Sequence, residues 1–254
     1  MKKIRMTLCL LLISSMLIAQ NEIPDLTGVQ KVIVKNYWGD QYIKGVDKNN
    51  NAFGLIAHFT GNSKKYRVTD SQLKEYVSVY KEKKTLYVLA RIPKGFESID
   101  LTLSIPSDLL VLSELHKGGN IYMENLENGV EVNSLNGSVN LKGIADYALV
   151  SAANGEVAVQ FESVDPAKAI SLITMNGGVS VTLPKETARD VRLISRKNGY
   201  VISQFDLEGE LPVRNLNMIA YSKVPIIEST TINGGGSLLF LSTQNGPIAI
   251  KKGN

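Results

Sequence analysis

Four acidic residues in the middle of the chain are of the type that could act on a sugar polymer. Two carboxylates held about 5 to 10 Å apart can hydrolyse a glycosidic bond, and neighbouring arginines could serve a polysaccharide lyase. The acidic candidates are Asp146, Glu156, Glu162 and Asp165, and the basic ones are Arg189, Arg192 and Arg196. Most fall in connections or at solvent-facing strand positions, where a charged side chain is usually solvated surface. We therefore expect no enzyme, with a carbohydrate-active enzyme as the alternative.

The other residues that could carry chemistry lack partners. The chain has two histidines, His58 and His116, and neither lies in a recognisable triad or metal motif. No Gly-x-Ser-x-Gly elbow, His-Glu-x-x-His or Walker loop occurs. The glycine run at 233–236 lacks the Lys-Ser/Thr and the helix that a phosphate site uses. The sequence thus predicts no catalytic, cofactor-binding or metal-binding residue.

One aromatic cluster is a candidate ligand platform. Tyr37, Trp38 and Tyr42 lie within six residues of one another, and aromatic faces suit sugar stacking. The alternative is that these rings cap the end of an all-β core, as large aromatic side chains commonly do.

Seven Asn-Gly pairs mark the elements that position these residues. From Asn154 to Asn176 and from Asn176 to Asn198 the step is 22 residues. Alternating apolar residues follow most of the pairs, which is the pattern of a short, half-buried strand. The pairs are Asn128–Gly129, Asn136–Gly137, Asn154–Gly155, Asn176–Gly177, Asn198–Gly199, Asn233–Gly234 and Asn245–Gly246.

Two all-β architectures satisfy this repeat. In a hairpin meander, each Asn-Gly pair is a two-residue type I′ turn between antiparallel strands. In a parallel β-solenoid, each pair is a corner, and every unit stacks on the equivalent part of the next. The constant step favours the solenoid. It predicts an apolar column of Val157, Val179 and Val201 and an amide ladder of Asn154, Asn176 and Asn198.

Residues 20–115 are also β-rich but lack the Asn-Gly repeat. The stretch "EYVSVYKEKKTLYVLARIP" predicts a hairpin with Val77 and Val79 facing Leu86 and Val88 across the charged turn. The stretch "TDSQLKEY" is long enough for one turn of helix.

The C-terminal part departs from the regular step. Asn198 and Asn233 are 35 residues apart, so 206–232 is either a loop or one further unit without an Asn-Gly turn. The closing "IAIKKGN" puts Lys251 and Lys252 on a last strand, where they would guard the sheet edge against pairing.

The first residues have the pattern of a secretory signal peptide. A positive start with Lys2, Lys3 and Arg5 precedes the largely apolar run Met6–Ala19. Without 1–19 the basic residues fall from 28 to 25 against 24 acidic ones, a net charge of +1. We therefore expect no nucleic-acid partner. The only cysteine, Cys9, is removed too, so the mature chain has no disulfide and depends on packing.

The stretch Leu101–Ile144 resembles a known family. An apolar strand ends in Ile105–Pro106, a strand and the Gly118–Gly119 turn follow, and then come "EVNSLNGSVNLKGI" and the recurring Asn-Gly units. These features are similar to those of the bacterial putative-adhesin β-strand-repeat family, a family of unknown function. The resemblance implies an exported right-handed β-solenoid and brings no catalytic residues with it.

Together these observations predict an all-β chain, a right-handed parallel β-solenoid with a β-rich N-terminal portion. The expected parts are the signal at 1–19, the continuous β-rich portion at 20–115 and the Asn-Gly solenoid at 116–254. The expected function is non-enzymatic: an adhesin or envelope scaffold that binds glycan, envelope polymer or protein. An envelope-stress sensor component is a further alternative. The expected location is the periplasm, the outer-membrane periphery or the extracellular space, without a transmembrane span in the mature chain.

Overall fold

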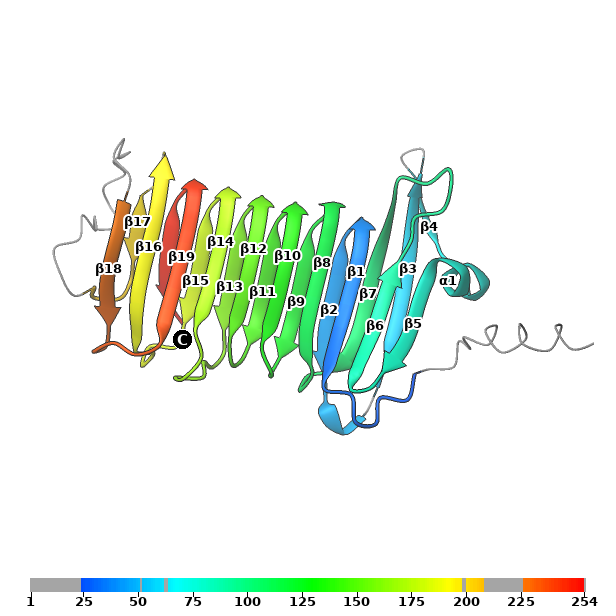
Figure 1. Cartoon of the computed structure of the whole chain (residues 1–254), viewed down its shortest axis with the longest axis horizontal. Helices are drawn as coiled ribbons and strands as arrows, with labels where there is room; N and C mark the ends of the chain where they lie inside the picture. The colour runs from blue at the N-terminus through cyan, green and yellow to red at the C-terminus, as the bar shows by residue number, and fades with distance from the viewer. Residues whose placement is uncertain (1–23, 51, 62–63, 198–199, 208–225, 254) are drawn as a thin grey trace, which may run out of the picture.

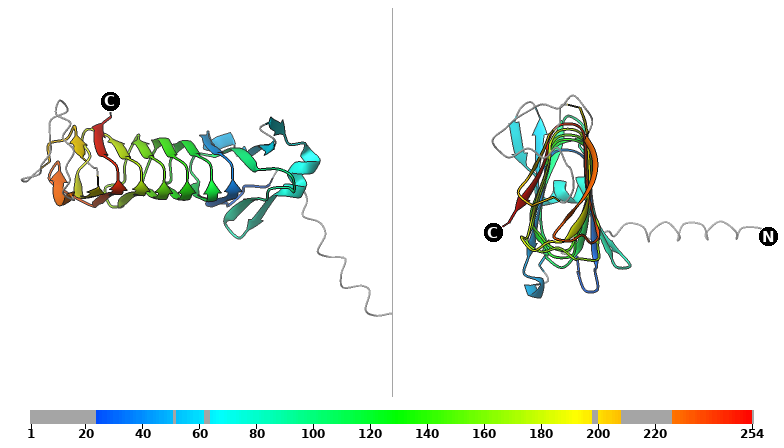
Figure 2. Two further views of the ribbon diagram at one scale, coloured as in Figure 1. Left: turned by 90° about the horizontal axis from the view of Figure 1, so that it is seen from above. Right: turned by 90° about the vertical axis from the view of Figure 1, so that its left-hand side faces the viewer.

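The computed structural model describes residues 24–50, 52–61, 64–197, 200–207 and 226–253. Its described part is all-β, with two large mixed sheets that lie face to face in an elongated, flattened stack (Figures 1 and 2). The signal segment, Asn198–Gly199 and most of 206–232 lie outside the described residues, so the predictions made for them stay predictions.

Sheet A contains ten strands, most of which alternate buried and exposed side chains. This alternation is expected of a strand with one face on the core. In spatial order the strands are β18 (Ile226–Ile232), β16 (Arg189–Lys197), β19 (Leu238–Asn245), β14 (Ile170–Asn176), β12 (Ala148–Asn154), β10 (Val130–Asn136), β8 (Leu110–Gly118), β1 (Lys31–Trp38), β6 (Thr85–Ala90) and β5 (Val77–Glu82).

Sheet B also contains ten strands and forms the opposite wall of the stack. In spatial order they are β17 (Val201–Ser203), β20 (Ile248–Lys252), β15 (Val179–Leu183), β13 (Val157–Phe161), β11 (Val139–Ile144), β9 (Ile121–Leu126), β2 (Gln41–Val46), β7 (Ser98–Pro106), β3 (Gly54–Gly61) and β4 (Lys64–Arg67).

The repeating unit is a rung, defined here as one strand of sheet A, a corner and one strand of sheet B. Strands β8 to β15 make four such rungs, and each strand pairs in parallel with its equivalent in the neighbouring rung. A hairpin meander would pair β12 with β13, but these strands lie in different sheets. Val157 is opposite Val179, as predicted.

Antiparallel pairs lie toward the two ends of the stack and make both sheets mixed. At one end β3 pairs with β4 and β7, and β5 with β6; at the other, β16 pairs with β18. The β5–β6 pair is the predicted hairpin, with Val79 opposite Val88. The predicted helical turn is α1 (Asp70–Tyr76). Its N-terminus is capped by Thr69, whose side chain and backbone form a reciprocal capping box with Gln72. A short 3-10 helix, η1 (Lys48–Asn50), follows β2.

Neither terminal rung lies at an end of the stack. The N-terminal rung β1–β2 lies between β6–β7 and β8–β9, and the C-terminal rung β19–β20 lies between β14–β15 and β16–β17. The prediction that Val201 stacks on Val179 is therefore wrong, because Ile248 of β20 separates them. The prediction that β20 is an edge strand is wrong for Ile248–Ile250, because β17 pairs with their outer side, whereas Lys251 and Lys252 lie beyond the register of β17.

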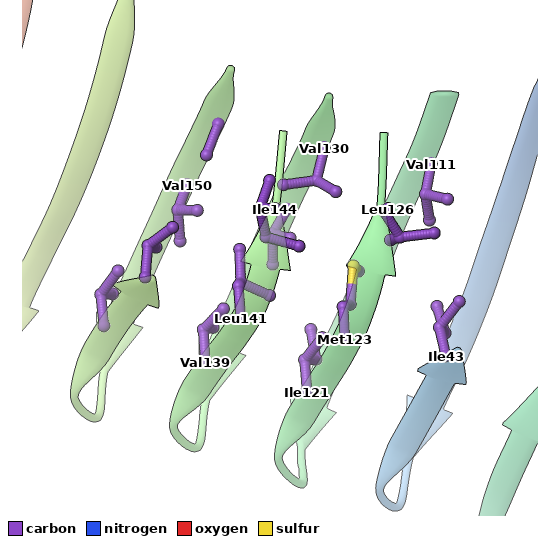
Figure 3. Close-up of a cluster of buried hydrophobic side chains, with 14 of the residues drawn as sticks. Ile43, Val111, Ile121, Met123, Leu126, Val130, Val139, Leu141, Ile144 and Val150 are labelled. Atoms are coloured by element: carbon purple, nitrogen blue, oxygen red, sulfur yellow. The ribbon is translucent and has the colours of Figure 1, made fainter. Parts of the chain in front are cut away.

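The core is the narrow space between the two sheets. Inward side chains from successive strands form columns along the stack, and Figure 3 shows them around β9 and β11. Ile121, Leu126, Val130 and Ile144 have no exposed surface. Complete burial of an aliphatic side chain of this size stabilises a fold by about 1.5–3 kcal/mol, so the columns supply the packing that a chain without disulfides needs.

A column of glycines brings the rungs together at the corners. Its members are Gly39, Gly119, Gly137, Gly155, Gly177 and Gly246, all with φ between 120° and 154°. A Cβ on Gly155 would lie 2.3 Å from the carbonyl oxygen of Gly137, and a Cβ on Gly177 would lie 2.2 Å from that of Gly155. Any side chain at these positions would therefore push neighbouring rungs apart.

We expect Gly155→Ala to lower the free energy of unfolding by more than about 2 kcal/mol, since it adds a backbone clash to an unfavourable φ. Gly28→Ala is the matched control. Gly28 also has a positive φ of 71°, but no atom lies within 4 Å of its added Cβ, so it should lose only about 1 kcal/mol. Urea unfolding of both variants measures the difference, and equal losses would contradict the steric role of the column.

Candidate functional site

Four of the predicted turn asparagines form one exposed amide ladder at the corners. Asn154 Nδ2 donates to Asn136 Oδ1, Asn176 Nδ2 to Asn154 Oδ1, and Asn245 Nδ2 to Asn176 Oδ1, each at 2.7 Å. Asn136 Nδ2 continues the series by donating to the Lys117 carbonyl at 2.6 Å. The predicted next member after Asn176 was Asn198, but Asn245 takes this place and Lys197 is opposite Asn245 in β16.

Two of the other Asn-Gly pairs serve different turns. Asn128 donates from Nδ2 to the Asp108 carbonyl at 3.1 Å, at the opposite edge of the rungs. Asn233 and Gly234 both have positive φ, 50° and 83°, in the connection that leads into β19. Asn198 and Gly199 lie outside the described residues.

A second ladder runs beside the first and uses side-chain oxygens as acceptors. Asp100 Oδ1 accepts from the backbone N–H of Asp40 at 2.9 Å, and Asp40 Oδ1 accepts from that of Asn120 at 2.8 Å. Asn120 Oδ1 then accepts from the N–H of Ser138 at 2.9 Å. The polar groups at these corners are therefore bound within the protein and serve its structure.

The structure does not bring the predicted aromatic platform together. Tyr37 is an outward residue of β1 in sheet A, Tyr42 is an outward residue of β2 in sheet B, and Trp38 lies at the corner between them. Tyr42 stacks on Tyr122, with ring centroids 4.8 Å apart and an interplanar angle of 6°. The Lys117 ammonium lies 3.9 Å from the Trp38 ring centroid. One face of Tyr42 and one face of Trp38 are thus already occupied.

The predicted acids do not converge on one site. Glu156 follows the Asn154–Gly155 corner, whereas Glu162 and Asp165 lie beyond the other end of β13. Asp146 forms an ion pair with Lys168 at 2.5 Å, and the backbone carbonyl of Asp146 accepts from the N–H of Asp165 at 3.0 Å.

The predicted arginines are also apart from one another. Arg189 is completely buried and donates to the carbonyl oxygens of Asp165 and Lys168, both at 2.8 Å. Desolvation lowers the pKa of this guanidinium, and these two contacts join β16 to the connection between β13 and β14. Arg192 lies over the Phe240 ring at 5.9 Å, and Arg196 is an exposed residue near the end of β16.

The two histidines lie on different sheets. His58 belongs to β3 in sheet B, opposite Asp100 and Arg67. His116 belongs to β8 in sheet A, with Nε2 3.6 Å from Glu114 Oε2. Among the described residues, no three His, Cys, Asp or Glu side chains could together hold a metal ion. No helix of the described part is long and apolar enough to cross a membrane.

A shallow depression on the outer face of sheet A was not predicted from the sequence. It measures about 450 Å³ and spans the neighbouring strands β8, β10, β12 and β14. One row of its lining is apolar, with Leu135 and Met175 about half exposed on either side of Ala153. We call this row, Leu135, Ala153 and Met175, the apolar row. Each member directly precedes an asparagine of the ladder, which is a regularity that the sequence already contains.

A polar row runs parallel to the apolar row inside the same depression. Asn133 is the register partner of Glu114 on one side and of Ser151 on the other. Asn133 and Ser151 are exposed, whereas Glu114 is half-buried and pairs with Lys35 at 2.9 Å. Neighbouring strands in a sheet are about 4.7–4.9 Å apart, so both rows present groups at that interval along the stack.

A smaller depression of about 200 Å³ lies at the opposite edge of the rungs. Three carboxylates line it, from Asp47, Glu127 and Glu162. Glu127 is already engaged: Oε1 accepts from Ser107 Oγ at 2.8 Å and Oε2 lies 3.7 Å from Lys48 Nζ. Glu162 is thus a predicted acid that lines a depression together with two other carboxylates.

We expect Asn154→Ala to lower the free energy of unfolding by about 1 kcal/mol, because it removes one donor and one acceptor from a partly solvated ladder. Asn133→Ala, at an exposed outward position of the same sheet, is the control and should change stability by less than about 0.5 kcal/mol. Denaturant titration of both variants measures this, and equal effects would show that the ladder adds no stability.

Tyr42 gives a pH-dependent prediction. Burial raises its pKa to about 12, and the Asp40 carboxylate, which accepts from the Tyr42 hydroxyl at 3.1 Å, adds to the rise. Because the folded pKa lies above the ordinary value of about 10, the stability that neutral Tyr42 contributes is complete below pH 10. That contribution is lost as the pH rises through 12.

The measurement is a tyrosinate absorbance titration of the protein and of its Tyr42→Phe variant, whose difference isolates Tyr42 among the ten tyrosines. Asp40→Asn should lower the Tyr42 pKa only in part, since burial is the larger cause. A difference curve centred near pH 10 would contradict the assigned environment.

The chain matches no known family profile and no curated protein. Among solved structures it is similar to a "putative cell adhesion protein" from Clostridium sporogenes, with a TM-score of 0.50 and 13% identity. That alignment covers 91% of this chain and 97% of the other. It also aligns with a "putative adhesin" from Bacteroides fragilis, with a TM-score of 0.38, 12% identity and coverage of 88% and 92%. At 13% identity, the likeness to the Clostridium protein is one of fold.

Proposed function

We propose that this chain is an exported, non-enzymatic adhesin or cell-envelope scaffold, built as a right-handed β-solenoid that binds an extended external polymer on the outer face of sheet A. Export is supported by the signal pattern at 1–19. The solenoid is supported by parallel pairing from rung to rung. The adhesive role is supported by the name of the Clostridium protein, whose fold this chain shares along 91% of its length.

The observation that carries the proposal is the depression on sheet A. It is open, it extends across several rungs, and it has an apolar row beside a polar row. A reaction needs groups that converge on one point, whereas binding of an extended chain needs groups repeated along a line. Leu135 and Met175 supply apolar contact, and Asn133 and Ser151 supply hydrogen bonds. A glycan, an envelope polymer or an extended segment of protein has this repeating chemistry.

A carbohydrate-active enzyme is the second candidate, because Glu162 lies beside Asp47 and Glu127 in the smaller depression. Two carboxylates on one surface are the minimum that glycoside hydrolysis needs. Product release from polymers, compared between the natural chain and Glu162→Gln, distinguishes this candidate from binding alone.

The test of the first proposal is binding of residues 20–254 to arrays of glycans, envelope polymers and proteins, with product release followed in parallel. We expect binding without turnover. Leu135→Asn combined with Met175→Gln should weaken binding at least about 10-fold, because full burial of one aliphatic side chain contributes about 1.5–3 kcal/mol.

Leu238→Asn is the matched control, because Leu238 is also on sheet A and is 42% exposed but does not line the depression. It should leave the affinity unchanged. Turnover of any polymer, or equal losses of affinity in the control and the double variant, would overturn the proposal.

A further inference from the structure

The C-terminal rung β19–β20 occupies a slot between two rungs that precede it in the chain. On one side β14 and β15 pair with it, and on the other β16 and β17 do, all in parallel. The register continues the ladder, with Asn245 opposite Asn176.

The slot is specific for a strand–corner–strand segment of this kind. The rung fills it with inward side chains that have no exposed surface: Leu239, Leu241, Thr243, Ile248 and Ile250. Thr243 Oγ1 donates to the Gly177 carbonyl at 2.8 Å. At the corner, a Cβ on Gly246 would lie 2.1 Å from the same carbonyl oxygen. An occupant therefore needs matched apolar spacing, a corner glycine and the length of both strands.

A glycine-rich connector joins this rung to the rest of the chain. Residues 233–237 contain Asn233, Gly234, Gly235 and Gly236, with φ of 50°, 83°, 86° and 157°. Three successive glycines give the connector wide conformational freedom. Five residues can span roughly 17 Å when extended, several times the strand spacing of about 4.8 Å.

A polar latch holds the connector closed. Ser237 Oγ donates to the Pro166 carbonyl at 2.6 Å, and buried Arg189 donates to Ser237 Oγ as well as to the Lys168 carbonyl. Asn233 Nδ2 donates to the carbonyls of Lys185 and Thr187, at 3.0 and 2.9 Å. These are the contacts that an outward swing of the connector would break.

We propose that the slot is an interaction surface for a second copy of this chain, and that two copies exchange their β19–β20 rungs. Every contact inside the slot is the same whether the rung comes from the same chain or from a partner. The two states differ in the connector, its latch and the protein concentration, which is the thermodynamic basis of domain swapping. Removing the rung from the folded protein would expose the two apolar edges of the empty slot, which is unfavourable. Exchange therefore takes place mainly during folding.

The test uses disulfide pairs in residues 20–254, which contain no cysteine. Ile173 and Ser242 are register partners across β14 and β19, so Ile173→Cys with Ser242→Cys reports which chain fills the slot. Ser151 and Ile173 are register partners across β12 and β14, so Ser151→Cys with Ile173→Cys is the control within one chain. Partner Cα atoms about 4.8 Å apart lie within the range that disulfides bridge.

Each variant is refolded at high and at low protein concentration, separated by size and then oxidised. We expect a dimer whose proportion rises with concentration during refolding. In that dimer the 173–242 pair should form covalent dimers on non-reducing gels, while the 151–173 pair should give disulfides within single chains. Absence of a dimer, or a dimer in which the 173–242 disulfide also stays within single chains, would overturn the exchange. Polymer binding is measured on the chain without these cysteines, because Ser151 and Ile173 line the depression, so the two proposals fail independently.

Discussion

The close approach of backbone to backbone at the glycine column is the constraint on which the rest of the structure depends. From Gly119 onward, each corner glycine lies directly against the carbonyl of the glycine before it, and Gly39 lies against that of Ile99, with no room for a Cβ. That contact keeps the corners at strand spacing, so both sheets stay in register through the same rungs. The asparagine ladder and the inward columns follow from this register, because equivalent residues then lie one above another. The corner could still form if the asparagine were replaced and the glycine kept. It could not form if the glycine were replaced and the asparagine kept.

The corners also explain how the fold holds together without disulfides. Their carbonyls find donors inside the stack: Thr174 Oγ1 bonds to the Gly155 carbonyl at 2.9 Å and Ser195 Oγ to the Gly246 carbonyl at 3.2 Å. Each hydroxyl is buried and crosses from one rung to the next. Neighbouring rungs therefore stabilise one another through many weak hydrogen bonds that share one register. Because β1–β2 and β19–β20, the first and last rungs in sequence, are each paired on two sides, the outermost strands come from segments that lie between them in the chain.

The Asn-Gly repeat was enough to predict an all-β stack and the ladder through Asn154 and Asn176. It failed at Asn198 for two reasons: Asn245 of the last rung is the register partner of Asn176, and the turn at Asn198 differs locally in a way that the sequence contains. The ladder rungs read Thr174-Met-Asn176-Gly and Thr243-Gln-Asn245-Gly, whereas two residues separate Ser195 from Asn198. That added residue puts Lys197, not Asn198, opposite Asn245. The insertion of the last rung between two earlier ones has no signal in the sequence. The spacing of the Asn-Gly pairs is a local property, whereas the order in which rungs stack depends on pairing between distant strands.

The candidate site was hard to predict for a related reason. Tyr37 and Tyr42 are five residues apart, yet a corner separates them and their side chains leave opposite sheets. The apolar row has the reverse geometry, since Leu135 and Met175 are 40 residues apart in sequence but line one depression. Since the inward side chains fill the core and the corner amides bind one another, the outward strand positions are the ones free to vary without loss of the stack. Under the proposed function, substitution along one outer row would therefore change the partner, while the register that presents the row stays fixed.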